Sequence, residues 1–211
     1  MSKVIKSIGL LLKFNSENAH KKPIKTGTTQ AQLATQEIAT ATRHIAAILP
    51  PSVFEKYEIK FSYGAGCFPK VPWIAIVPKG KKVSNSISTC ICFGKFGDGV
   101  VIGTMFPYPK QEGVYKTEGR RTIVGRIDIN GSSSSTKYNN KFVNPEDFLS
   151  SGLDEAKLLK HILGSIEIMN TYLSEIKTDQ AIHQIRSVGY PVLQVNSPFD
   201  ALLLKRRSTR T

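Results

Sequence analysis

Residues suited to contacting a ligand concentrate between Tyr57 and Val77. Trp73, the only tryptophan of the chain, follows a corner rich in glycine and proline, and Lys70 lies just before it. A flat aromatic ring beside ammonium groups suits a stacked base and its flanking phosphates. A core tryptophan with ordinary surface lysines explains the same pattern. The residue types alone therefore leave nucleic-acid binding and core packing both open.

Acidic residues late in the chain raise a second kind of chemistry, the metal-dependent cleavage of nucleic acid. Glu146 and Asp147, followed by Glu155 and Lys157, superficially match the two acids and a lysine around a nuclease Mg²⁺. That geometry needs the second acid and the lysine on a strand, whereas Glu155 and Lys157 begin a strongly helical pattern. We therefore predict no catalytic site, no enzyme activity and no cofactor, with a Mg²⁺-dependent restriction nuclease as the alternative.

Three cysteines, Cys67, Cys90 and Cys92, are an odd number for a chain of this size. This count indicates a reducing compartment, for which the cytoplasm fits, and no disulfide framework. A structural zinc site would need a fourth ligand such as His44 and usually contains a CxxC pair, which the chain lacks. We expect buried small thiols and no metal site.

The chain has a formal net charge of +13, and most of the excess lies in its middle part. Residues 60–141 contain 13 Lys or Arg and 4 Asp or Glu. Such an imbalance favours a polyanionic partner, which can be DNA, RNA or an anionic membrane surface. No uninterrupted apolar run reaches about 18 residues, so we expect no membrane-spanning helix.

Hydrophobic spacing predicts helices at about 2–14, 29–49 and 154–176. Strands are predicted to start at 57 and 73 and to cover 86–94, 99–106, 122–129 and, briefly, 142–143. Helices followed by strands and then helices indicate an α+β fold. We expect a single domain over 1–204 with a curved, mostly antiparallel sheet of about five strands, flanked by N- and C-terminal helices. The basic end, 205–211, is predicted to be a flexible tail.

A more specific pattern runs from Lys60 to Gly103. Its ordered residues are Ser62-Tyr63-Gly64-Ala65-Gly66, Phe68, Pro72-Trp73 before an apolar strand, and Ser84-Asn85 before a hairpin. This order resembles the N-terminal DNA-binding domain of McrB, the specificity and GTPase subunit of the McrBC restriction system, which acts on DNA with modified cytosine. The resemblance implies that the chain binds duplex DNA and flips a methylated base from the stack into a pocket.

The resemblance also implies roles for individual residues. Its pocket walls fall by position on Ala65, Trp73 and Cys92, with Tyr63 and Cys67 shaping the pocket. Ala65 and Cys92 are smaller than the residues that the family has there, so the target stays open among 5-methylcytosine, 5-hydroxymethylcytosine, N4-methylcytosine and N6-methyladenine. The residues predicted to hold phosphates or fill the gap in the duplex are Lys70, Lys79, Lys81, Lys82, Ser84, Asn85, Arg120 and Arg121.

The GTPase part of the resembling family has no counterpart in this sequence, because GxxxxGK[ST] does not occur. The resemblance therefore implies a motor or nuclease, as a subunit or domain, in cis or in trans. A different class of function stays open: a non-specific single-strand or RNA-binding module that uses the same Trp73 and lysines. Such a module binds single strands more tightly than duplexes and is indifferent to base modification.

Overall fold

A computed structural model of the chain describes residues 2–64, 66–106, 126–129 and 142–187, with side chains described up to residue 175. Contacts within the chain divide it into two units, Met1–Leu173 and Ser174–Thr211. The boundary lies inside the last helix, and the sheet and the candidate site belong to the first unit. The expectation of one domain up to residue 204 stays a prediction.

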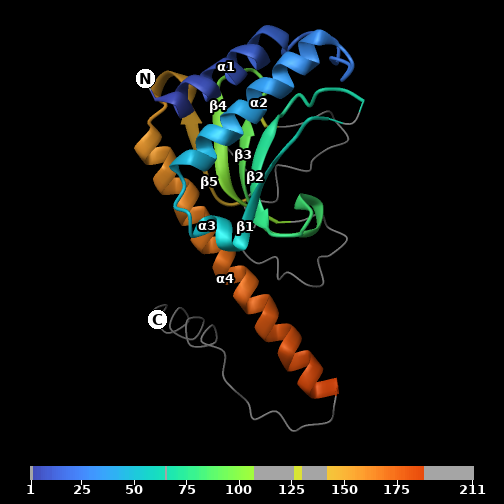
Figure 1. The fold of residues 1–211 in the computed structure, drawn as a ribbon, viewed down its shortest axis with the longest axis vertical. Helices are drawn as coiled ribbons and strands as arrows, with labels where there is room; N and C mark the ends of the chain where they lie inside the picture. Colours follow the sequence, from blue (N-terminus) through green and yellow to red (C-terminus); the bar gives the residue numbers. More distant parts are fainter. Residues whose placement is uncertain (1, 65, 107–125, 130–141, 188–211) are drawn as a thin grey trace, which may run out of the picture. The chain divides into compact units, whose positions relative to one another are not determined.

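Two long helices begin the fold, and a third follows the sheet (Figure 1). The helices are α1 (Lys3–Asn18), α2 (Thr29–Ile48), the short α3 (Val53–Lys56) and α4 (Glu155–Ser187). Each long helix begins where a side-chain oxygen accepts a hydrogen bond from the first turn. Ser2 accepts from the Ile5 amide at 3.2 Å, Thr28 from Ala31 at 3.3 Å, and Asp154 from Lys157 at 2.9 Å.

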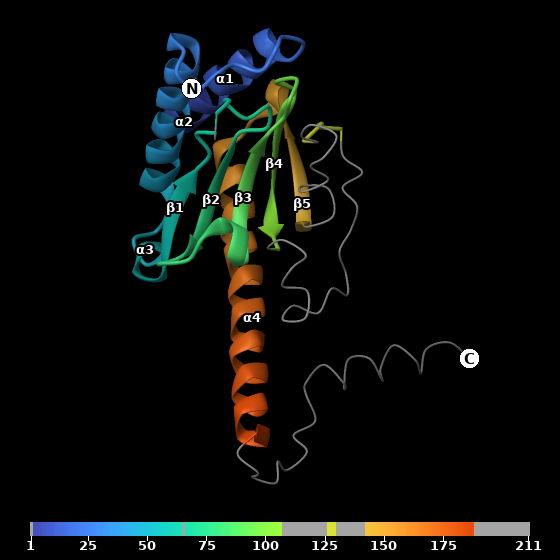
Figure 2. The same cartoon turned by 90° about the vertical axis from the view of Figure 1, so that its right-hand side faces the viewer.

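Five strands form one antiparallel sheet in which every strand pairs with its neighbours in sequence. They are β1 (Tyr57–Phe61), β2 (Trp73–Pro78), β3 (Ser88–Phe93), β4 (Gly99–Met105) and β5 (Phe142–Leu149). Figure 2 shows them side by side in this order. The predicted α+β class, with a five-stranded antiparallel sheet between N-terminal helices and a C-terminal helix, is confirmed.

Side-chain alternation gives the two faces of the sheet different partners. The register places Ile74, Ile91 and Ile102 on one face. Thr104 shares that face, and its hydroxyl donates to the Ser165 carbonyl of α4 at 2.7 Å, so this face is the one that α4 covers. In Figure 1, α2 crosses in front of the strands, and it contacts β1.

The opposite face has a hydrophobic cluster of its own. Nine buried residues form it: Val71, Ala75, Cys90, Cys92, Val101, Met105, Ile127, Ile129 and Phe142. Trp73, Val83 and Leu149 are partly buried and pack against this cluster. The face that does not carry the helices is therefore the one on which Trp73 lies.

The last strand is longer than its sequence suggests. We expected a short strand at 142–143 before Pro145, but β5 continues to Leu149. Proline is tolerated because β5 is at the edge of the sheet, where one side of the strand has no ladder to complete. Asn144 has a φ of +54°, and the register shifts between Ile102 and Thr104. The chain thus passes the proline through a β-bulge.

Two further boundaries differ from the predictions. Residues 126–129, the described part of the strand expected at 122–129, do not form a strand. Their alternating pattern instead reflects Ile127 and Ile129 packing against the cluster opposite the helices. The last helix was expected to end near residue 176 but extends to Ser187.

Candidate functional site

The connection between β1 and β2, residues 62–72, is fixed to a distant part of the chain. Lys25 and Cys67 form an isolated antiparallel bridge. The Phe68 amide donates to the Ile24 carbonyl at 2.8 Å, and the Thr26 amide donates to the Gly66 carbonyl at 3.1 Å. The polar segment between α1 and α2 therefore holds the connection by backbone pairing.

Two glycines shape this connection as the sequence predicted. Gly64 has a φ of +82° and Gly66 one of +87°, which side chains with a Cβ rarely adopt. A Cβ on Gly64 would lie 2.0 Å from the Cys67 carbonyl oxygen, whereas one on Gly66 would meet nothing within 4 Å. Gly64 is thus required by space and conformation, and Gly66 by conformation alone.

Trp73 occupies the first position of β2 and pairs directly with Cys92 of β3. Its amide donates to the Ser62 hydroxyl at 2.9 Å, and its carbonyl accepts from the Ser62 amide at 2.9 Å. The side chain is partly buried against the cluster on the face without helices. Of the predicted pocket residues, the structure brings Trp73 and Cys92 together.

The thiols of Cys90 and Cys92 are completely buried, as expected, whereas Cys67 is exposed. Burial raises the pKa of the Cys90 thiol to about 12, and burial with the neighbouring Cys90 raises the pKa of Cys92 well above its ordinary value. Both side chains therefore pack as neutral groups. Cys92 is beneath the surface, so a base beside Trp73 reaches it only if neighbouring residues move.

Tyr63 lies apart from Trp73. Ser62 is opposite Trp73, so the next side chain, Tyr63, projects to the other face. Its ring is 67% exposed and lies edge-on to Phe61, with 6.5 Å between the ring centroids. It borders an open hollow with Gly64 and four residues before and within α2: Thr26, Gln32, Thr35 and Gln36. Ala65 lies outside the described residues.

The residues predicted to hold phosphates fall at opposite ends of β2. Lys70 precedes the strand, whereas Lys79, Lys81, Lys82, Ser84 and Asn85 follow it, and all six are exposed. Five residue steps of about 3.4 Å place the two ends about 17 Å apart. Arg120 and Arg121 lie outside the described residues.

Side chains of β1 hold the basic loop after β2 in place. Glu58 accepts from the Gly80 amide at 3.0 Å and pairs with Lys60 at 3.0 Å. Lys60 also donates to the Lys81 carbonyl at 2.8 Å. The hydrogen bond from Lys60 is the main reason that the pKa of Glu58 is lowered. These contacts engage the backbone of the loop and leave the ammonium groups of Lys79, Lys81 and Lys82 exposed.

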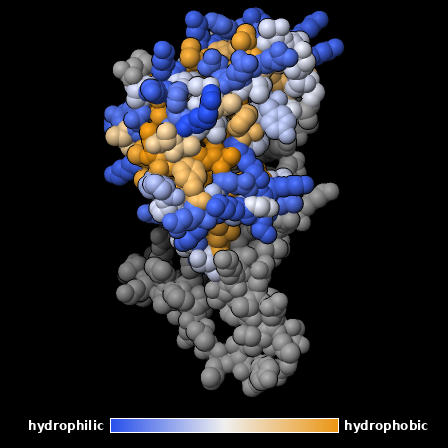
Figure 3. Space-filling view, in the orientation of Figure 1, coloured by the Kyte–Doolittle hydropathy of each residue, from blue (hydrophilic) through white to orange (hydrophobic). Residues whose placement is uncertain are grey.

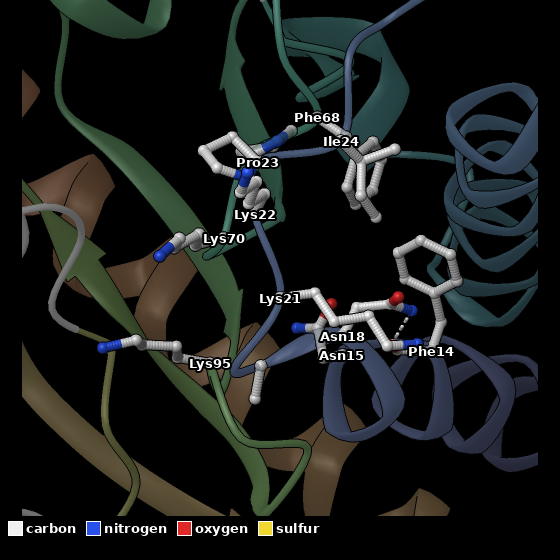
Figure 4. A pocket seen from close by; sticks show the side chains of 12 residues that line it. Phe14, Asn15, Asn18, Lys21, Lys22, Pro23, Ile24, Phe68, Lys70 and Lys95 are labelled. Atoms are coloured by element: carbon white, nitrogen blue, oxygen red, sulfur yellow. Dashed lines mark hydrogen bonds between the residues drawn. The ribbon is translucent and has the colours of Figure 1, made fainter. Parts of the chain in front are cut away.

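A second group of cations surrounds a hollow near the end of α1, which we call the basic hollow (Figure 4). Its rim has Lys21, Lys22, Lys70 and Lys95, and its walls include Phe14 and Phe68, whose rings meet edge-on with centroids 5.5 Å apart. Sequence reasoning assigned no role to Lys21, Lys22 or Lys95. The bond from the Phe93 amide to the Pro72 carbonyl brings the start of the β3–β4 turn, with Lys95, near the end of the β1–β2 connection, with Lys70.

The residues of the alternative nuclease do not gather at one point. Glu146 pairs with Ile102 and Asp147 with Val101, so their side chains project to opposite faces of β5. Glu146 contacts His161 Nδ1 at 2.9 Å, while Asp147 accepts from the Arg126 amide at 2.6 Å. Within the described part of the chain, no three His, Cys, Asp or Glu residues are grouped to hold a metal ion.

Figure 3 shows the surface in the orientation of Figure 1, with a hydrophobic area surrounded by hydrophilic residues. Leu10 of α1 and Leu33 of α2 are exposed hydrophobic residues. None of the helices in the described residues combines the length and the hydrophobicity needed to cross a bilayer.

No protein-family model matches the chain, and a search of curated proteins finds no significant match.

Proposed function

We propose that the chain binds double-stranded DNA and reads a methylated or otherwise modified base by flipping it out beside Trp73. In this proposal it is the specificity part of a modification-dependent restriction system, with a motor or nuclease in cis or in trans. The observation that carries the proposal is the position of Trp73. The residue is partly buried at the start of β2, directly after the connection with two positive-φ glycines and three residues from the exposed Lys70.

The cations at the two ends of β2 support a duplex as the ligand. The strand that lies between them is about 17 Å long, from five strand steps, which exceeds the width of the major groove, about 12 Å. Lys70 at one end and Lys79, Lys81 and Lys82 at the other can therefore approach phosphates on both strands. Flipping a base costs a few kcal/mol, and stacking on an aromatic ring returns about 1–3 kcal/mol.

Trp73 itself provides the readout for a test, because it is the only tryptophan of the chain. Matched duplexes carrying cytosine, 5-methylcytosine, 5-hydroxymethylcytosine, N4-methylcytosine or N6-methyladenine would compete for the protein at one fixed salt concentration. We expect one modified duplex to bind at least about tenfold more tightly, which is about 1.4 kcal/mol. The same duplex should quench the Trp73 fluorescence, since a stacked base contacts the ring.

Two variants of the stacking residue and one control complete the experiment. Trp73→Ala should remove the preference for the modified duplex, and Trp73→Phe, which retains a ring for packing, should keep part of it. Leu33→Ala, at an exposed position of α2, should leave the preference unchanged. Equal affinity for all duplexes in the folded wild-type protein contradicts the proposal. Tighter binding to single strands, without dependence on modification, would instead support the single-strand or RNA-binding alternative.

A further inference from the structure

We propose that the basic hollow binds a phosphate group of the DNA backbone and so holds the strand that continues from the flipped base. This inference rests on the proposed function and adds a site to it. Most of the residues that carry it, Lys21, Lys22 and the walls Phe14 and Phe68, come from outside the strands that frame Trp73.

Three segments that are far apart in sequence converge at the basic hollow. Lys21 and Lys22 follow α1, Lys70 belongs to the β1–β2 connection, and Lys95 begins the turn between β3 and β4. The bonds that fix the β1–β2 connection to residues 24–26 hold two of these segments together. In Figure 4 the amino groups of Lys70 and Lys95 point the same way, away from Phe14. The convergence is therefore maintained by backbone pairing and does not depend on the lysine side chains.

The cations of the basic hollow are largely free of acidic partners. Among the described residues, no carboxylate lies within ion-pair distance of Lys21, Lys22 or Lys70. Lys95 differs, because Asp128 is 3.9 Å from its ammonium nitrogen. Ammonium groups without an acidic partner can donate charge-assisted hydrogen bonds to a phosphate.

The dimensions and the polar groups of the hollow restrict what it accepts. Its open space is about 30 Å³, more than the roughly 10–15 Å³ that one water molecule needs in the same measure. The side-chain amides of Asn15 and Asn18 each donate inside the protein, Asn15 to the Gly94 carbonyl at 2.9 Å and Asn18 to the Phe14 carbonyl at 2.8 Å. The hollow can therefore admit a small group such as a phosphate oxygen beside the lysines of its rim.

A simpler explanation covers only part of this arrangement. Lysines after the end of α1 are favourable because the carbonyl end of a helix carries partial negative charge, and this accounts for Lys21 and Lys22. It does not account for Lys70 and Lys95, which lie in the β1–β2 connection and in the turn between β3 and β4. Their placement beside Lys21 and Lys22 is the part that a phosphate site explains.

The test compares two triple variants with the same reduction in charge. One is Lys21→Gln, Lys22→Gln and Lys70→Gln; the control is Lys3→Gln, Lys6→Gln and Lys56→Gln, which alters exposed lysines of α1 and α3. Affinity for modified and unmodified duplexes is measured over a series of salt concentrations. The slope of log affinity against log salt falls by about 0.9 for each phosphate that the protein no longer neutralises. We expect the first variant to bind both duplexes at least about tenfold more weakly, with a slope smaller by about one unit for the one phosphate lost, and the control to bind less than about threefold more weakly.

The outcomes separate this site from the reading of the base. A uniform weakening confined to the first variant supports the phosphate site even if no duplex modification is preferred. If the preference for one modified duplex persists and both triple variants lose the same affinity, the result supports the proposed function. The same result overturns the phosphate site. A further measurement tests whether inorganic phosphate binds the basic hollow. If it binds at Phe14 and Lys70 by NMR shift perturbation and duplex DNA does not displace it, the hollow is a site for free phosphate and the DNA assignment is wrong.

Discussion

At the scale of single residues, the connection before Trp73 depends on two glycines that look equivalent in sequence. Both have a positive φ, yet only Gly64 lies against another part of the backbone, the Cys67 carbonyl. The Gly-Ala-Gly pattern predicts a sharp corner, but it cannot reveal which glycine has a close neighbour, because that neighbour is fixed by the bridge between Lys25 and Cys67.

Gly64→Ala should be much more destabilising than Gly66→Ala. Each substitution places a Cβ in the left-handed region, at a cost of about 1–2 kcal/mol. At Gly64 the new carbon would also lie 2.0 Å from a carbonyl oxygen, so the connection must shift. Urea unfolding followed by Trp73 fluorescence measures the difference in free energy of unfolding. Equal destabilisation by the two substitutions would contradict the described geometry of the connection.

Single residues also determine which of the predicted site residues lie on the same face of the sheet. Tyr63 and Trp73 are both aromatic residues of the same corner, so the sequence and the resemblance suggest one pocket. The bond between the Trp73 amide and the Ser62 hydroxyl instead places Ser62 opposite Trp73, and strand alternation turns Tyr63 to the other face. Such one-residue shifts follow from hydrogen bonding across strands, which composition and spacing do not contain.

At the scale of elements, the attachment of α4 to the sheet is centred on the bulge in β5. The register shift between Ile102 and Thr104 interrupts the ladder there. His161 Nε2 lies 3.1 Å from both the Ile102 and the Asn144 carbonyl oxygens, to which it donates. The helix thus supplies a donor at the point where the sheet lacks one.

His161→Leu should lower the free energy of unfolding by about 1–3 kcal/mol, because it leaves the carbonyl of the buried Ile102 without its donor. Glu146→Gln, which removes only the charge of the partner at Nδ1, should cost less than about 1 kcal/mol, since the Glu146 side chain is 56% exposed. His161→Gln, which retains a donor, should lie between the two. Denaturant unfolding of the three variants would contradict this interpretation if Glu146→Gln were as destabilising as His161→Leu.

The helices and the central strands were predictable, because their signals are local. Thr28 and Asp154 act as caps, Pro50 follows the end of α2, and apolar spacing defines the faces between. The length of strand β5 was underestimated because Pro145 argues locally against a strand. A proline is tolerated in an edge strand, and only the assembled sheet shows that β5 is at the edge. The basic hollow was missed for the same reason, since its lysines meet only through tertiary contacts.

At the scale of the whole molecule, the sheet, the helices α1 to α3, the first part of α4 and the basic hollow lie in the unit Met1–Leu173. The buried residues of α4 up to residue 175, where side chains are described, are Leu158, Ile162, Ser165, Ile166 and Met169, and they also lie in this unit. The described core that positions the candidate site is therefore contained in this unit.

Removal of residues 174–211 should leave the free energy of unfolding within about 1 kcal/mol of the full chain, because no buried residue of the described core is removed. The matched truncation after residue 160, which also removes Ile162 and Met169, should unfold the protein, since these side chains are fully covered. Thermal unfolding of both chains by circular dichroism provides the comparison. A folded chain 1–160 or an unfolded chain 1–173 would contradict this division.

The strictly sequential order of the strands also determines how the chain can fold. Strands β3 and β4 meet across five residues, 94–98, whereas β4 and β5 meet across 36 residues, 106–141. Closing the longer segment costs about 1.7 kcal/mol more in chain entropy. Because contacts that are local in sequence form fast, we expect the first four strands to assemble before β5 and α4 close the structure. On this expectation the corner around Trp73 belongs to the part that assembles early.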